Sequence, residues 1–517
     1  MLLLLALLAA SPDVPTATCA TARMLREAPP PRDFGVGVLG TPVARDALAV
    51  PNALVSEHFA LRWGNGGGLD QATLTAALER LEQVWSVEVD QLQNPKPPGS
   101  DAFLFNVYVG DTGDNAPPLA SVGAAAYLSY DAEGVLMMVL GIDGMRDLDG
   151  LGSYTMAHEL YHAIQQATTN YFNDEAAWYG EASAEWMAGE VFPDNPYVGI
   201  NLFGLAFFPH VPLDSFSQQG TLEDYHRYGA FIFLRYVSEH GGLGEVVLDT
   251  YRTPNIVGDP LEVIGTALVG HGAQLADVVG EFAAHTAVLD YQQHDQFALI
   301  LESIAAAYPN DDHRLAGTVD VAAATDDAID VAPEDGPGRY GFHTVRLDTA
   351  AVAAPGLALE VSVDARAAGS LGSATAVRAT VVQVQGSTPS YRPVPLANGQ
   401  GAVRFNDVSS DSELFLVVAA VPESAAPGET FPYRYRVRHL AIDAPRGPDD
   451  DDGDDRDPDA DEREREVVVP LGCGGSPGQT LAWSLLALAT LTQRPRRRPA
   501  PGAPRGVSPR SWPVPKA

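Results

Sequence analysis

The pattern of apolar and polar residues changes twice along the chain and divides its body into three regions. In the first region, short apolar or alternating runs predict β-strands over residues 56–63, 103–109, 123–129 and 135–142. Between the first two runs, residues 69–92 carry apolar side chains at helical spacing. The sequence Asp131-Ala-Glu-Gly134, between the last two runs, is typical of a hairpin turn.

From residue 151 to about 308 the apolar residues recur at helical spacing instead, which predicts helices over residues 151–168, 175–190, 222–240, 260–269, 275–291 and 295–307. Beyond residue 318 the pattern returns to short alternating runs between Gly, Pro and Asp turns, over residues 343–347, 358–363, 377–384, 414–421 and 431–437. That spacing predicts an all-β sandwich. The order of elements therefore predicts an α+β fold: a mixed sheet with a helical C-terminal half over residues 51–310, then a β-sandwich over residues 315–442.

The first long predicted helix contains the string His158-Glu159-Leu160-Tyr161-His162. Residues four apart project from nearly one face of a helix, so both imidazoles can bind one ion. Glu159 lies about 100° around the helix from His158, so its carboxylate can reach a water on the ion without binding the ion itself. Two histidines that hold a metal and a glutamate that takes a proton from water are the parts of a zinc hydrolase.

The next predicted helix supplies two more carboxylates, Glu181 and Glu185. A catalytic zinc ion needs a third protein ligand and one open position. The eighteen residues between His162 and Glu181 allow the first helix to end, a loop to form, and a second helix to return. Glu185 falls one turn beyond Glu181 on the same face. From there it can accept a hydrogen bond from the non-ligating nitrogen of either histidine and fix the tautomer of that ring.

Composition and charge exclude several other classes of protein. The chain has 67 acidic and 32 basic residues, a formal charge of −35, which repels phosphate backbones and anionic lipid, so we expect no nucleic-acid partner. The only two cysteines, Cys19 and Cys473, exclude a disulfide scaffold and a cysteine-ligated zinc module. No internal apolar run reaches the roughly 18 residues of a transmembrane helix, so we expect a soluble body. The histidines other than 158, 162 and 226 are scattered and are interpreted as solvated or core groups.

The string His158-Glu-x-x-His162, the eighteen-residue spacing and the segment Trp178-x-x-Glu181-x-x-Ala184 together resemble the gluzincin metallopeptidases. The Trp-x-x-Glu spacing is similar to that of the aminopeptidase branch, and the acid at Glu185 is similar to the acid that supports a zinc-binding histidine in thermolysin. The likeness covers residues 50–308 and is greatest to uncharacterised metalloproteases of myxobacterial type. It implies that His158, His162 and Glu181 bind one Zn²⁺ per chain and that Glu159 is the general base.

The resemblance has two departures. Aminopeptidases of this clan hold the free amine of the substrate with a Glu in a Gly-x-Met-Glu-Asn segment, whereas Gly123-Ala-Ala-Ala-Tyr127 has no Glu. Cleavage within an extended peptide, paired with an edge strand from residues 123–142, is therefore favoured. Gluzincins also supply a Tyr or His that stabilises the oxyanion. Here Tyr228 is the first candidate and His226 the second, and ordinary packing aromatics are the alternative.

Both ends of the chain carry processing signals. Residues 1–20 form an apolar run of signal-peptide length that predicts export, and residues 21–50 follow as a linker or short pro-segment. Residues 443–467 form an acidic linker; its alternate aspartates could coordinate Ca²⁺, but without EF-hand spacing they favour a self-repelling spacer. In residues 468–517, Cys473, an apolar stretch and an Arg cluster resemble the myxobacterial C-terminal sorting signal. That resemblance implies display at the cell surface or outer envelope, with the membrane contacted only through this tail.

These observations predict an exported zinc metallopeptidase whose substrate is a protein or peptide. The alternative is a surface-anchored adhesion or binding protein in which the β-sandwich binds the partner and the metal site is vestigial. The intact set of His158, His162 and Glu181 argues against a decayed site, because the loss of one ligand would be enough to reveal decay.

Overall fold

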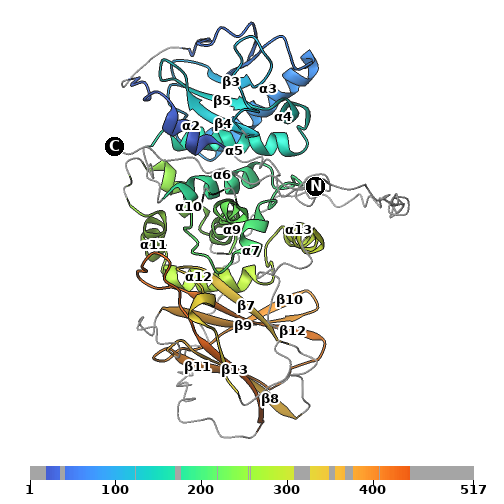
Figure 1. The fold of residues 1–517 in the computed structure, drawn as a ribbon, viewed down its shortest axis with the longest axis vertical. Coiled ribbons are helices and arrows are strands. Elements are labelled where there is room, and N and C mark those ends of the chain that lie inside the picture. Colours follow the sequence, from blue (N-terminus) through green and yellow to red (C-terminus); the bar gives the residue numbers. More distant parts are fainter. Residues whose placement is uncertain are drawn as a thin grey trace, which may run out of the picture. The chain divides into compact units, whose positions relative to one another are not determined.

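The computed structural model describes residues 19–34, 41–122, 124–168, 176–217, 219, 221–240, 242–253, 256, 258–307, 327–347, 356–366, 376–406 and 408–442. All of them lie in one compact unit, residues 1–450. The chain has an α+β fold (Figure 1). The predicted signal peptide up to residue 18, the acidic linker and the sorting tail lie outside the described residues.

The first sheet has five strands in the order β1-β2-β3-β5-β4. Its strands are β1 (Asn52–Val55), β2 (Phe59–Trp63), β3 (Phe105–Val109), β4 (Ala126–Tyr130) and β5 (Leu136–Leu140). Strands β2, β3 and β5 run parallel, whereas β1 and β4 pair antiparallel with their neighbours. The predicted hairpin between β4 and β5 is confirmed, with Gly134 at φ 74° in the turn. Strand β4 therefore forms one edge of the sheet.

Both faces of this sheet are covered, which explains why its inner strands read as continuous apolar runs. One face packs against α3 (Gln71–Trp85) and α5 (Leu151–Gln165), and Leu128 and Met138 point into that core. The opposite face contributes Tyr127 and Val139 to a smaller cluster, and α2 (Thr21–Glu27) packs on β4 (Figure 1). The predicted helix over residues 69–92 is confirmed up to Trp85 and continues as a π-helix, Ser86–Gln91.

The middle of the chain is helical, as predicted, but more finely divided. Its elements are α4 (Ile142–Arg146), α6 (Ala177–Val191), α7 (Leu202–Phe207), a 3-10 turn (Leu222–Tyr225), α8 (His226–Gly229), α9 (Phe231–Glu239), α10 (Gly244–Arg252), α11 (Pro260–Gly270), α12 (Leu275–Thr286) and α13 (His294–Ala307). The prediction of a single helix over residues 222–240 is wrong, because the chain divides there into the 3-10 turn, α8 and α9. Helix α7 packs closely there: a Cβ on Gly229 would lie 2.7 Å from the Leu205 nitrogen.

Helix α12 also ends earlier than predicted, at Thr286, because Leu289 takes a left-handed conformation with φ 53°. Helices α2, α4, α7 and α10 were not predicted. Three of them are under eight residues long, too short for a helical period to stand out in the sequence.

In the part of the chain described here, no single helix has the length and apolar content of a membrane span; α11 and α12 meet those criteria only as a pair bent by 101°.

The C-terminal strands form two antiparallel four-stranded sheets, ordered β10-β9-β12-β7 and β11-β8-β13-β6. The strands are β6 (Ile329–Asp330), β7 (Phe342–Leu347), β8 (Leu357–Asp364), β9 (Val377–Gln385), β10 (Thr388–Pro393), β11 (Gln400–Phe405), β12 (Ser412–Ala420) and β13 (Arg434–Ala441). The two sheets share a buried cluster that includes Val361, Val381 and Leu416. The other face of β9 and β12 packs on α12, and Val382 and Phe415 join the core of the helical region. Strands β6, β10 and β11 were not predicted; all three are short, and Phe405 is their only buried residue.

Candidate metal centre

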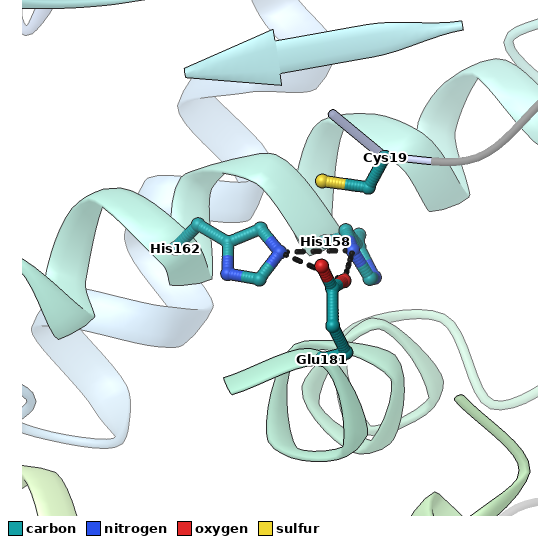
Figure 2. Close-up of side chains that lie close together, drawn as sticks. All are labelled: Cys19, His158, His162 and Glu181. Carbon is teal, nitrogen blue, oxygen red and sulfur yellow. Dashed lines mark hydrogen bonds and ion pairs between the residues drawn. The ribbon is translucent and has the colours of Figure 1, made fainter. Parts of the chain in front are cut away.

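Helix α5 brings two imidazoles together in the core of the protein. His158 and His162 lie one turn apart, are 6% and 4% exposed, and their Nε2 atoms are 3.1 Å apart. The helix is buried along most of its length because it packs between the first sheet and α6. Figure 2 shows both rings turned toward the same point, as the i, i+4 spacing predicted.

Helix α6 supplies the carboxylate that completes the group. The Glu181 Oε2 atom lies 3.4 Å from Nε2 of His158 and 3.4 Å from Nε2 of His162 (Figure 2). Ligand atoms about 2.0–2.1 Å from a tetrahedral zinc ion are about 3.3–3.4 Å apart, so the three atoms have nearly the spacing of one face of that tetrahedron. The three predicted ligands therefore converge with the geometry that one ion requires.

The other ring nitrogens have acceptors that fix the tautomers. His158 Nδ1 lies 3.5 Å from Oε2 of Glu185, and Tyr154 Oη holds that carboxylate by donating to Oε1 over 3.0 Å. His162 Nδ1 lies 2.8 Å from Oε1 of Gln165. Glu185 is thus on the predicted face and supports His158. Gln165 was missed, although its position one turn after His162 on the same helix was a signal for it.

This second layer of contacts leaves three electron-pair donors facing one another at the centre. The Gln165 amide donates to the Gly180 carbonyl over 2.9 Å, so its oxygen faces His162. When both Nδ1 atoms carry the ring protons, the Nε2 atoms of His158 and His162 each direct a lone pair toward the other ring and toward Glu181 Oε2. That oxygen is buried and has no hydrogen-bond partner among the described residues. Three electron-pair donors that converge in this way fit a cation.

Electrostatics favour a positive charge at the same point. Burial by itself would raise the pKa of the Glu181 carboxyl, but its contacts with His158 and His162 hold that pKa well below the usual range. Burial would lower the pKa of His162, yet the charge and hydrogen bond of the nearby Cys19 and the Glu181 carboxylate raise it to about 10. Protons and a metal ion therefore compete for this site.

The predicted general base lies beside the triangle. Glu159 is 1% exposed and lines a cleft together with His158, Tyr154, Ala126 and Tyr228. Its Oε2 accepts a hydrogen bond of 2.8 Å from the Thr21 hydroxyl. The carboxylate therefore faces the cleft beside the three candidate ligand atoms and is not one of them.

The two oxyanion candidates have different positions. Tyr228 lines the cleft, with its ring centroid 6.2 Å from that of His158. Burial, and then the charge of Glu181, raise the pKa of Tyr228 well above its usual value, so the hydroxyl stays protonated and can donate. His226 is 1% exposed but does not line that cleft, and neither ring nitrogen has a hydrogen-bond partner in the described part of the chain. Of the two oxyanion candidates, the geometry therefore favours Tyr228.

His226 should contribute to a loss of stability in mild acid. Burial, and then the charge of His210, lower its pKa to about 4, whereas the unfolded chain has a value near 6.5. The unfolded state therefore binds more protons between these values, and the contribution of His226 to stability falls by about 2 kcal/mol from pH 7 to pH 5. Denaturant unfolding at both pH values should give a smaller loss for His226→Gln than for the wild type. The matched control is His271→Gln, at an exposed position, which should lose as much stability as the wild type. If His226→Gln also loses as much unfolding free energy between pH 7 and pH 5 as the wild type, the prediction is contradicted.

A second group, His240, His285 and Asp290, also has ligand atoms within 4.8 Å of one another. His240 Nε2 contacts the Asp290 carbonyl oxygen at 2.6 Å, and His285 Nδ1 lies 2.9 Å from the Asp290 carboxylate. Tyr391 of β10 stacks on His285 and donates to the same carboxylate over 2.6 Å. His240, His285 and Tyr391 all contact Asp290, and the cluster is explained as a polar contact between α9, α12 and β10. That these histidines are not ligands stays a prediction.

Glu88, in the π-helical turn, is a buried acid that the sequence analysis missed. It is 0% exposed, and neither carboxylate oxygen has a hydrogen-bond partner among the described residues. Burial raises the pKa of Glu88 well above its usual value, and the charges of His158 and His162 oppose that rise. A buried acid whose charge interacts with His158 and His162, within an irregular helical turn, is a feature that only the packed structure reveals.

The chain is an α+β protein with a buried group of His158, His162 and Glu181 beside the buried carboxylate of Glu159. The family model described as "Family of unknown function (DUF6055)" matches residues 44–438, and the chain therefore belongs to the DUF6055 family. The matched range covers the first sheet, the helices and both C-terminal sheets. The chain matches none of the curated proteins with which it was compared.

Proposed function

We propose that this chain is an exported zinc metallopeptidase of the gluzincin type. The observation that carries the proposal is the triangle of buried donors from His158, His162 and Glu181, 3.1–3.4 Å apart, with the Glu159 carboxylate in the adjoining cleft. In this proposal residues 51–310 form the catalytic domain. The two C-terminal sheets form a β-sandwich appendage, and the sorting tail attaches the protein to the cell surface.

The residues of the cleft fit the hydrolysis of a peptide bond by activated water. A zinc ion held by the three ligands would polarise a water molecule and bring its pKa close to neutral. Glu159 accepts a proton from that water and later delivers it to the leaving amine. Tyr228 donates a hydrogen bond to the carbonyl oxygen of the substrate as negative charge develops there. Glu185 and Gln165 hold the two imidazoles in the tautomers that leave Nε2 free for the ion.

The substrate in this proposal is an extended segment of a protein or peptide, cut internally. Strand β4 is an edge strand, and Ala126 at its start lines the same cleft as Glu159. An edge strand can bind an extended peptide through main-chain hydrogen bonds, with the carbonyl to be cleaved next to the metal. We propose Zn²⁺ as the cofactor, one per chain; Ca²⁺ binding by the acidic linker is a weaker proposal.

Incubation with a mixed-sequence peptide library tests the function directly. Because Cys19 lies next to the ligand atoms, the assay uses both the full chain and a Cys19→Ser variant, loaded with zinc. Mass spectrometry should find internal cuts that a chelator abolishes and added zinc restores, since removal of the ion removes the water activation. No cleavage by either protein, or cleavage that persists after complete metal removal, would refute the proposal.

A further inference from the structure

The N-terminal segment lies along the edge strand next to the metal centre. The Ala20 nitrogen donates to the Ala126 carbonyl over 3.5 Å, and the Leu128 nitrogen of β4 donates to the Thr21 hydroxyl over 2.8 Å. Helix α2 then packs on β4, and Thr21 at its first position is 2% exposed. The segment therefore uses the same strand edge on which we placed the substrate.

The same segment contacts both groups to which we assigned chemistry. The Thr21 hydroxyl donates to Oε2 of the Glu159 carboxylate over 2.8 Å. Tyr228 Oη donates to the Cys19 carbonyl oxygen over 3.5 Å. A main-chain carbonyl of the chain itself thus lies where the carbonyl of a bound peptide is expected, and access to the cleft is restricted.

The Cys19 thiol belongs to the ligand group. Its Sγ atom and the ligand atoms of His158, His162 and Glu181 all lie within 4.8 Å of one another, and Figure 2 shows the sulfur turned toward the two imidazoles. Cys19 has no disulfide partner among the described residues, and its sulfur accepts a hydrogen bond of 3.4 Å from the Thr21 nitrogen. The buried Glu181 oxygen without a hydrogen-bond partner points independently to a cation at this position. Thiolate sulfur is a preferred ligand of zinc, so the set offers a closed tetrahedral site.

We propose that Cys19 is the fourth ligand of the metal ion and that residues 19–27 keep the enzyme latent. A zinc site with four protein ligands has no position for water, whereas a catalytic site keeps one open. The latency rests on the proposed function; the ligation by Cys19 does not. The latent form is therefore the chain that still carries residues 1–20, the predicted signal peptide. Activation requires the segment to leave the cleft, and a cut after residue 20 would remove the thiol from the rest of the chain.

Cobalt substitution tests the ligation without any assay of activity. The full chain is stripped of metal and loaded with Co²⁺, and its absorption spectrum is compared with those of Cys19→Ser and Cys473→Ser, the latter a matched control outside the described residues. We expect a near-ultraviolet thiolate-to-cobalt band in the wild type and in Cys473→Ser, and its loss in Cys19→Ser. Zinc should also slow alkylation of Cys19 at least tenfold. Bound cobalt without this band in the wild type would overturn the proposal.

Peptide cleavage then tests the latency. Zinc-loaded Cys19→Ser should cleave at least ten times faster than the wild type, while Cys473→Ser should match the wild type. A thiolate band with equal cleavage rates would overturn the latency but keep the ligation. A thiolate band with no cleavage in any variant, including a chain cut after α2, would instead refute the peptidase function, so the two failures are distinguishable.

Discussion

Replacing Glu159 with Gln should lower kcat for peptide cleavage by about 10²–10⁴-fold and leave the zinc content at one per chain. Gln has nearly the shape of Glu but cannot accept the proton from water, so the chemical step fails while the ligands remain. Glu159 faces the cleft and lies outside the ligand triangle, which is why metal binding should survive. The measurement is cleavage of a fluorogenic peptide in the Cys19→Ser background, with metal analysis of the same samples.

The matched control is Glu302→Gln, at an exposed position on α13. It removes one carboxylate of the same kind far from the cleft in sequence and should leave kcat unchanged. If Glu159→Gln and Glu302→Gln cleave equally fast with full zinc content, Glu159 has no role in proton transfer. A loss of zinc in Glu159→Gln would instead show that its carboxylate supports the ligands.

Replacing His162 with Ala should remove the metal as well as the activity. In the Cys19→Ser background the variant loses one of the three remaining donors and leaves the amide oxygen of Gln165 without its imidazole partner, so zinc content should fall from about one per chain to near zero after dialysis. Peptide cleavage should then fall to the level of the chelated Cys19→Ser protein. Elemental analysis together with circular dichroism separates loss of metal from loss of fold.

His271→Ala is the control for the same chemical change, because His271 is exposed and lies outside the ligand group. It should keep both zinc and activity. Wild-type protein that folds and binds no zinc at all would favour the alternative in which the C-terminal sheets bind a partner. Full zinc content in His162→Ala would show that the ion is held elsewhere.

The candidate centre follows from the sequence because its main parts are local. His158 and His162 are four residues apart on α5, so helical geometry brings them together, and Glu181 lies on α6, which packs against α5 and carries the carboxylate to the same point. Four of the five strands of the first sheet, all but β1, and the longer helices were also predicted, since their apolar patterns extend over enough residues to stand out. The choice between Tyr228 and His226 was left open, because the chain breaks into a 3-10 turn and two short helices there.

What the sequence by itself determined is the α+β order of elements and the choice of His158, His162 and Glu181 as candidate ligands with Glu159 beside them. Only the tertiary structure decided that Cys19 and Thr21 lie at that centre, because 138 positions separate Thr21 from Glu159 and no periodicity relates them. That Glu185 supports His158 and not His162 was likewise decided by packing of α5 against α6, which also orients the Gln165 amide through the Gly180 carbonyl. Local spacing fixes contacts within a helix, whereas contacts between distant segments depend on which surfaces the whole chain buries together.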